Sequence, residues 1–174
     1  HTDGEGYFLH HGLWNLLLRR IALEYDKINR DGKEDLASAT VIVEFSRGSE
    51  HGGYREAYPH LGRRILETAS VLYIDVSYEE SVRKNTRRFN PDKPDSILEH
   101  GLPMEKMERL YKETDWDEFS ADNPRLLHVN EYRLPYVVMD NSDDVTTRGG
   151  TALSERLEDC LSKLWDGYTA GNTH

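Results

Sequence analysis

Four basic residues lie close together in the sequence, at Arg83, Lys84, Arg87 and Arg88. On a helix, residues four positions apart are neighbours, so this spacing gathers the four cations on adjoining surface. Guanidinium groups bind phosphate oxygens, and positive charge stabilises a phosphoryl group in transfer. The alternative is a solvated face whose cations pair with nearby acids. We expect a phosphate-binding surface, with Arg83 and Arg87 as catalytic candidates and Arg88 as a cofactor-binding candidate.

A second candidate centre is Glu44, which directly follows the β-branched run Val41–Val43. Arg47 and a glycine-rich segment, residues 48–53, come next. An acid at the tip of a buried strand can hold Mg²⁺, directly or through water, or accept a substrate proton. Glu44 is therefore the predicted catalytic and Mg²⁺-binding residue. The alternative is a strand-end side chain that meets solvent.

Other reactive side chains give weaker signals. His10 and His11 are adjacent, and adjacent residues on a helix do not face one point, so the pattern disfavours a zinc site. Cys160 falls in the apolar stripe of the last expected helix, which indicates a core residue rather than a nucleophile. Asp75 lies at the end of the second expected strand and Asn141 lies just after the third, where ligands bind to an open α/β sheet.

Helices and strands must hold these candidate residues in position. Apolar residues from Leu13 to Ile28 recur near a period of 3.6, which predicts a helix ended by Gly32. Ser77 followed by Glu80 forms a capping-box pattern. Short apolar runs without alternation predict strands buried on both faces. The expected strands are Val41–Val43, Val71–Val76 and Pro135–Met139, and the other expected helices are 55–68, 77–89, one after Pro103, and 151–166.

Strands that alternate with helices predict a three-layer α/β/α fold with a mainly parallel sheet. We expect one domain over residues 1–174, with residues 83–116 as a lid-like helical region between two strands. The chain has 174 residues, a net charge of −10 and 37% hydrophobic residues, which suits a globular domain. The acidic balance disfavours nucleic-acid binding. With no long apolar run and one cysteine, we expect a cytoplasmic protein away from membranes.

Three segments resemble P-loop kinases of the nucleoside and nucleotide type. The stretch from Val41 to Arg47 resembles the strand of such kinases that ends in an acid and then an arginine. Residues 75–88 are similar to the strand and basic helix that lead into their lid. Residues 134–141 resemble the last core strand and the turn near the nucleotide base. The likeness covers most of positions 38–166.

The resemblance implies ATP and Mg²⁺ as cofactors and phosphoryl transfer to a small-molecule acceptor. It also implies that the segment near the start and the glycine-rich loop form the acceptor site, and that the turn after the last strand lies near the nucleotide. The residues so implicated are Asp3, His10, Arg47, Tyr54 and Arg55 for the substrate, and Asn141 for the cofactor.

This sequence departs from the pattern of that family in one motif. The phosphate-binding motif G-x-x-x-x-G-K-[ST] does not occur, because Gly32-Lys33 is followed by Glu34. We therefore expect a strand and a P-loop before His1 in the intact protein, and association between copies through sheet edges that the missing strand leaves open. The alternatives are a non-catalytic module that binds a nucleotide or a protein, and an NTPase with a mechanical or regulatory output.

Overall fold

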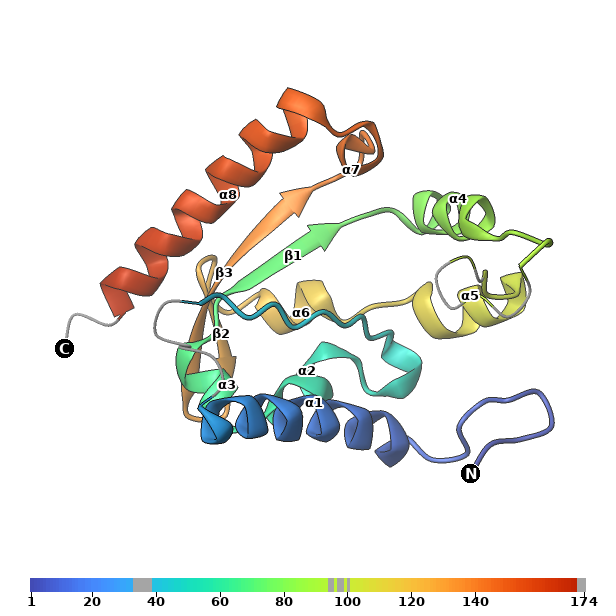
Figure 1. The fold of residues 1–174 in the computed structure, drawn as a ribbon, viewed down its shortest axis with the longest axis horizontal. Coiled ribbons are helices and arrows are strands. Elements are labelled where there is room, and N and C mark those ends of the chain that lie inside the picture. Colours follow the sequence, from blue (N-terminus) through green and yellow to red (C-terminus); the bar gives the residue numbers. More distant parts are fainter. Residues whose placement is uncertain (33–38, 94–95, 97–98, 100, 172–174) are drawn as a thin grey trace. The chain divides into compact units, whose positions relative to one another are not determined.

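The computed structural model describes residues 1–32, 39–93, 96, 99 and 101–171. The chain divides into two compact units, which are described separately (Figure 1). The first unit contains His1–Ala69 and Thr114–Leu134, and the second contains Ser70–Glu113 and Pro135–His174. The expectation of one domain stays a prediction. Lys33 and Glu34, and five positions of the lid-like region, lie outside the described residues.

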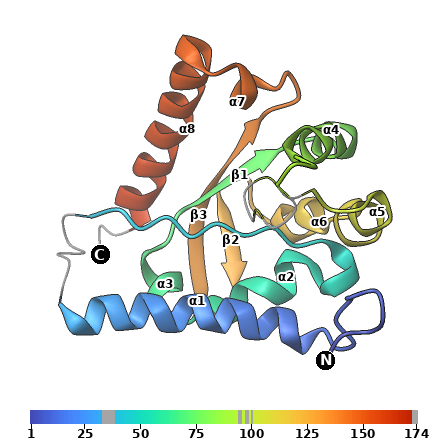
Figure 2. The ribbon, with the colours of Figure 1, turned by 45° about the vertical axis from the view of Figure 1, so that its right-hand side comes forward.

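The first unit begins with helix α1, Gly12–Asp31. This element confirms the helix predicted from apolar spacing, and Gly32 ends it in the left-handed conformation at φ 59°. One side of α1 packs on the short helix η2, Tyr58–Leu61, with Leu18 buried. Figure 2 shows α1 along one side of this unit, beside α2 and α3.

The single helix expected over 55–68 is three short pieces. They are α2, Gly53–Ala57, then η2, and then α3, Arg63–Thr68. Pro59 lacks a backbone donor, and Gly62 has a φ of 80°, a conformation that side chains disfavour. The α-helical hydrogen-bond ladder is therefore interrupted at both positions. A further 3₁₀ turn, η1, covers Ser49–His51.

Aromatic side chains form the core of the first unit. Tyr54 meets Trp116 edge to face at a centroid separation of 5.6 Å, and Tyr58 lies 5.3 Å from Phe119. Trp116 and Phe119 belong to helix α6, Trp116–Ser120, which the sequence analysis did not predict. Each aromatic pair adds about 1 kcal/mol beyond the area that it buries.

A hairpin completes this unit. Strand β2, Leu126–Val129, is joined by two residues to β3, Tyr132–Asp140, so the two strands run antiparallel. Asn130 takes a φ of 53°, the left-handed conformation that tight hairpin turns need. The sequence analysis predicted the later part of β3 and missed β2.

The predicted strand Val41–Val43 is wrong. The segment belongs to no strand, and Ile42 is 86% exposed. Val43 and Phe45 are partly buried, whereas Ile42 and Glu44 are exposed, so burial alternates along the chain. One face therefore packs on the unit, through Phe45 against Tyr58, and the other meets solvent. Glu44 consequently does not sit at the tip of a central strand.

The second unit is built on two parallel strands. Strand β1, Val71–Asp75, pairs with β3 in the register Val71↔Tyr136 to Asp75↔Asp140. Helix α8, Gly150–Gly171, packs on this pair, and a Cβ atom at Gly167 would come within 3.1 Å of Pro135. The other helices of the unit are α4, Tyr78–Arg88, α5, Met104–Tyr111, and α7, Val145–Arg148.

Several local predictions for the second unit are confirmed. The Ser77 hydroxyl accepts a hydrogen bond from the Glu80 amide at 3.2 Å and begins α4. Cys160 is buried on α8, as its place in the apolar stripe predicts. However, Leu161 and Trp165 of the same predicted stripe are 54% and 66% exposed. The apolar face that packs is therefore narrower than the sequence suggests.

The expected three-layer α/β/α fold with a mainly parallel sheet is wrong. Within the described residues, the strands form one three-stranded sheet in the order β1-β3-β2. One of its pairings is parallel and the other antiparallel, so the sheet is mixed. The prediction fails because Val41–Val43 does not join the sheet and because β2 does. No helix in the described part is long and apolar enough to cross a membrane.

Candidate functional site

The candidate site lies in the second unit, where β1 and β3 end. Because these strands are parallel, Asp75 and Asp140 stand at the same edge, and the Asn141 amide extends the pairing by donating to the Asp75 carbonyl at 2.9 Å. From this edge the chain enters α4 on one side and α7 on the other (Figure 1). Ligands of open sheets bind outside the carboxyl ends of parallel strands.

An open depression of about 400 Å³ lies between α4 and α7. Its cations come from the last two turns of α4, and its hydroxyl groups come from α7. Among the described residues, those that line it include no carboxylate. The lining residues, which we call the cationic pocket, are Lys84, Arg87, Arg88, Thr146 and Thr147.

Arg87 and Arg88 are the open cations of this pocket. Both side chains are exposed, and neither forms an ion pair with another described residue. Their partners would be solvent or an anion, because five N–H donors on each guanidinium need acceptors. Two adjacent arginines therefore supply positive charge that the described part of the chain does not neutralise.

Arg83 and Lys84 are held differently, by the carboxylate of Asp144. Lys84 lies 3.0 Å from Asp144, and Arg83 pairs with both Asp144 and Glu80. Burial disfavours the charged form of Asp144, but hydrogen bonds from Thr147, Lys84 and Arg83 outweigh burial and hold its pKa well below the usual range. Asp144 is thus anionic at neutral pH and neutralises part of the positive charge beside the pocket.

Asn141 holds the α7 segment, which carries Thr146 and Thr147, in position. Its side chain is fully buried, accepts from the Thr146 amide at 3.1 Å and donates to the Thr146 hydroxyl at 2.9 Å. Lys84 donates to the same hydroxyl at 2.9 Å. The sequence analysis placed Asn141 near a nucleotide base, whereas in the structure it positions the α7 segment.

The substrate-binding candidates lie in the first unit. Arg47 is buried, and its guanidinium donates to the His51 carbonyl at 2.8 Å and to Asn15 at 2.5 Å. It also faces the Trp14 ring at 5.8 Å. Burial is the main cause that lowers the pKa of Arg47, and the charge of Glu56 opposes it. These contacts tie α1 to the glycine-rich loop.

Tyr54 and Arg55 lie in the first turn of α2, where a carboxylate from another segment accepts hydrogen bonds from their backbone amides. Asp115 accepts from the Tyr54 amide at 2.6 Å and from the Arg55 amide at 3.0 Å. The Arg55 guanidinium reaches the Glu118 carbonyl at 2.9 Å and lies over the Phe119 ring. Both residues therefore bind α2 to α6.

The remaining candidate residues from the sequence analysis are Asp3, His10 and Glu44. Asp3 accepts from the amides of Glu5 and Tyr7 at 3.0 and 2.8 Å and shapes the first loop. His10 and Glu44 are exposed. Within the described residues, the structure brings no three His, Cys, Asp or Glu side chains together in a geometry that could hold a metal ion. Glu44 therefore belongs to no such group among the described residues.

Thr146 and Thr147 are pocket residues that the sequence analysis missed. Their signal is the run of acids and hydroxyl residues from Asp143 to Thr147, which begins three residues after the last residue of β3 and continues into α7. Comparisons with protein-family models, with curated proteins and with solved structures gave no match to this chain.

Proposed function

We propose that this chain binds the phosphate groups of a nucleotide such as ATP in the cationic pocket. The observation that carries the proposal is the pair of exposed arginines, Arg87 and Arg88, beside the hydroxyl groups of Thr146 and Thr147. Guanidinium forks and hydroxyl donors are the groups that phosphate oxygens accept from. In a chain of net charge −10, this local excess of cations gives a polyphosphate a defined place to bind.

Phosphate binding is the function that the geometry supports best, because the pocket combines cations with hydroxyl groups. The wider proposal, which rests on the resemblance to P-loop kinases, is phosphoryl transfer from ATP with Mg²⁺ to a small-molecule acceptor in the cytoplasm. Glu44 and the acceptor-site residues of the sequence analysis belong to that wider proposal.

The binding should be weak and sensitive to salt. Arg87 and Arg88 are exposed side chains, and exposed charges are screened beyond about 8 Å at physiological ionic strength. A P-loop, in contrast, holds phosphates with fixed backbone amides. We expect ATP to bind more tightly than AMP, and adenosine to bind least, since each phosphate adds contacts.

The variant Asp144→Asn tests the proposal by a gain of binding. Asn removes the charge that engages Lys84 and Arg83 and also tolerates the left-handed φ of 54° at this position. Because the substitution frees Lys84 and Arg83 from this ion pair, it should tighten ATP binding about fivefold. Isothermal titration calorimetry at low salt measures the change.

The matched control is Asp159→Asn, which removes the same charge from the second unit. Asp159 pairs with Lys163 on α8, and neither residue lines the pocket. ATP affinity in this control should stay within about twofold of the parent. Equal tightening in both variants would show a general effect of net charge and would contradict a site at the cationic pocket.

A further inference from the structure

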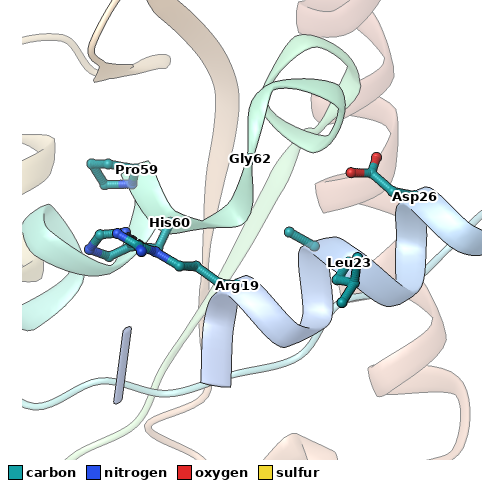
Figure 3. A pocket seen from close by; sticks show the side chains of 7 residues that line it. Arg19, Leu23, Asp26, Pro59, His60 and Gly62 are labelled. Carbon is teal, nitrogen blue, oxygen red and sulfur yellow. Dashed lines mark hydrogen bonds between the residues drawn. The ribbon is translucent and has the colours of Figure 1, made fainter. Parts of the chain in front are cut away.

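A second depression, of about 380 Å³, lies in the first unit between α1 on one side and η2 with the following Gly62 on the other (Figure 3). It is independent of the cationic pocket, which belongs to the other unit. Its lining combines a positive group, a negative group and apolar atoms. The lining residues, which we call the α1 pocket, are Arg19, Ala22, Leu23, Asp26, Pro59, His60 and Gly62.

One end of the α1 pocket carries a fixed positive charge. The Nε atom of Arg19 donates to Nδ1 of His60 at 3.3 Å, which requires Nδ1 to be unprotonated. Burial is the main cause that lowers the pKa of His60, and the charge of Arg19 adds to it. His60 is therefore neutral at pH 7, and the charge at this end belongs to Arg19, whose orientation His60 sets.

Asp26 supplies the negative charge on the same helix. It lies seven residues from Arg19, which places the two backbones about 10 Å apart along the helix axis. Figure 3 shows Arg19 directed toward His60, away from Asp26. Arg64 of α3 approaches one oxygen of Asp26 at 3.5 Å, and both of these side chains are more than half exposed.

An apolar surface separates the two charges. Leu23 is four residues after Arg19 and three before Asp26, so the three side chains share a helix face. Leu23 is 48% exposed, and Ala22 and Pro59 complete the apolar lining. A ligand whose two ends are charged and whose middle is apolar would cover Leu23 while it meets both charges.

We infer that the α1 pocket binds an extended zwitterion, with a carboxylate at Arg19, an ammonium group at Asp26 and an apolar spacer over Leu23. The separation of the two charges favours an ω-amino acid over an α-amino acid, whose charged groups are adjacent. Simple fatty acids and simple amines are not the preferred class, since each would meet only one of the two charged ends.

The probe is 6-aminohexanoate, titrated into the full chain at pH 7.5 and followed by ligand-observed NMR. For a ligand of nine non-hydrogen atoms we expect a dissociation constant of about 1 mM. Hexanoate, hexylamine and glycine should each bind at least about tenfold more weakly, because each lacks one charge or the spacer. Hexanoate or hexylamine binding as tightly as 6-aminohexanoate would overturn the inference, as would an absence of binding by 6-aminohexanoate.

Two variants locate the site. Arg19→Gln and Asp26→Asn should each weaken 6-aminohexanoate binding by at least about tenfold. The matched control is Arg20→Gln on the same helix, because Arg20 pairs with Glu24 and does not line the pocket. Unchanged affinity in Arg19→Gln or in Asp26→Asn would overturn the inference, and so would an equal loss in the control.

Discussion

Replacing Arg87 and Arg88 together by alanine is expected to weaken ATP binding about thirtyfold or more. The two guanidinium groups are the exposed cations of the cationic pocket, and neither pairs with a described residue. A hydrogen bond to a charged group contributes at least about 1 kcal/mol, and two such losses give an effect of this size. Calorimetry at low salt measures it.

The control for that variant removes two cations from elsewhere in the same unit. Lys112 and Lys163 pair with Glu108 and Asp159, and neither lines the pocket. The double variant Lys112→Ala/Lys163→Ala should retain ATP affinity within about threefold of the parent chain. If both double variants lost affinity equally, the attraction would come from overall charge rather than from a site.

Asn141→Ala is expected to lower the free energy of unfolding by about 2 kcal/mol or more. The substitution removes both side-chain bonds to Thr146 and leaves a buried amide without its acceptor. It should also weaken ATP binding, because the α7 segment that carries Thr146 and Thr147 loses its anchor. Urea denaturation followed by circular dichroism measures the change in stability.

Ser154→Ala is the comparison for this second prediction. Ser154 lies on the exposed side of α8 and bonds only to the Gly150 carbonyl, at 3.3 Å. Its replacement should change the free energy of unfolding by no more than about 0.5 kcal/mol. A similarly small change in Asn141→Ala would mean that Asn141 does not fix the α7 segment.

Local sequence signals predicted α1 and α4. The apolar period along α1, the glycine after Asp31 and the Ser77 cap of α4 all depend on residues within a few positions of each other. Such features need no knowledge of distant contacts, so they can be derived from the chain itself. Strand β1 and the later part of β3 were also predicted, because both are short apolar runs that precede turns.

The sheet as a whole could not be predicted in the same way. Val41–Val43 has the composition of a buried strand, but the pairing that would make it one depends on a partner elsewhere in the chain. Hairpin strand β2 and helix α6 are short, and the aromatic residues of α6 become core through packing against Tyr54 and Tyr58. Composition alone does not distinguish these outcomes.

In the candidate site, too, features set by nearby residues were predicted and features set by distant contacts were not. Helical spacing predicted that Arg87 and Arg88 share a surface, since both lie on α4. It did not predict that Asp144, sixty-one residues after Arg83, engages that arginine. Arg47, expected at a substrate, is instead buried against Trp14 and Asn15. Long-range ion pairs and burial decide which charged residues remain available for a ligand.

The most direct test of the proposed function is an NMR titration of the ¹⁵N-labelled chain with ATP, read at backbone amides and arginine Nε–H groups. The account predicts that the largest shifts belong to the cationic pocket, at Arg87, Arg88, Thr146 and Thr147, and that they shrink as salt is added. Shifts concentrated in the glycine-rich loop around Arg47 and Tyr54, or no shifts at millimolar ATP, would contradict it.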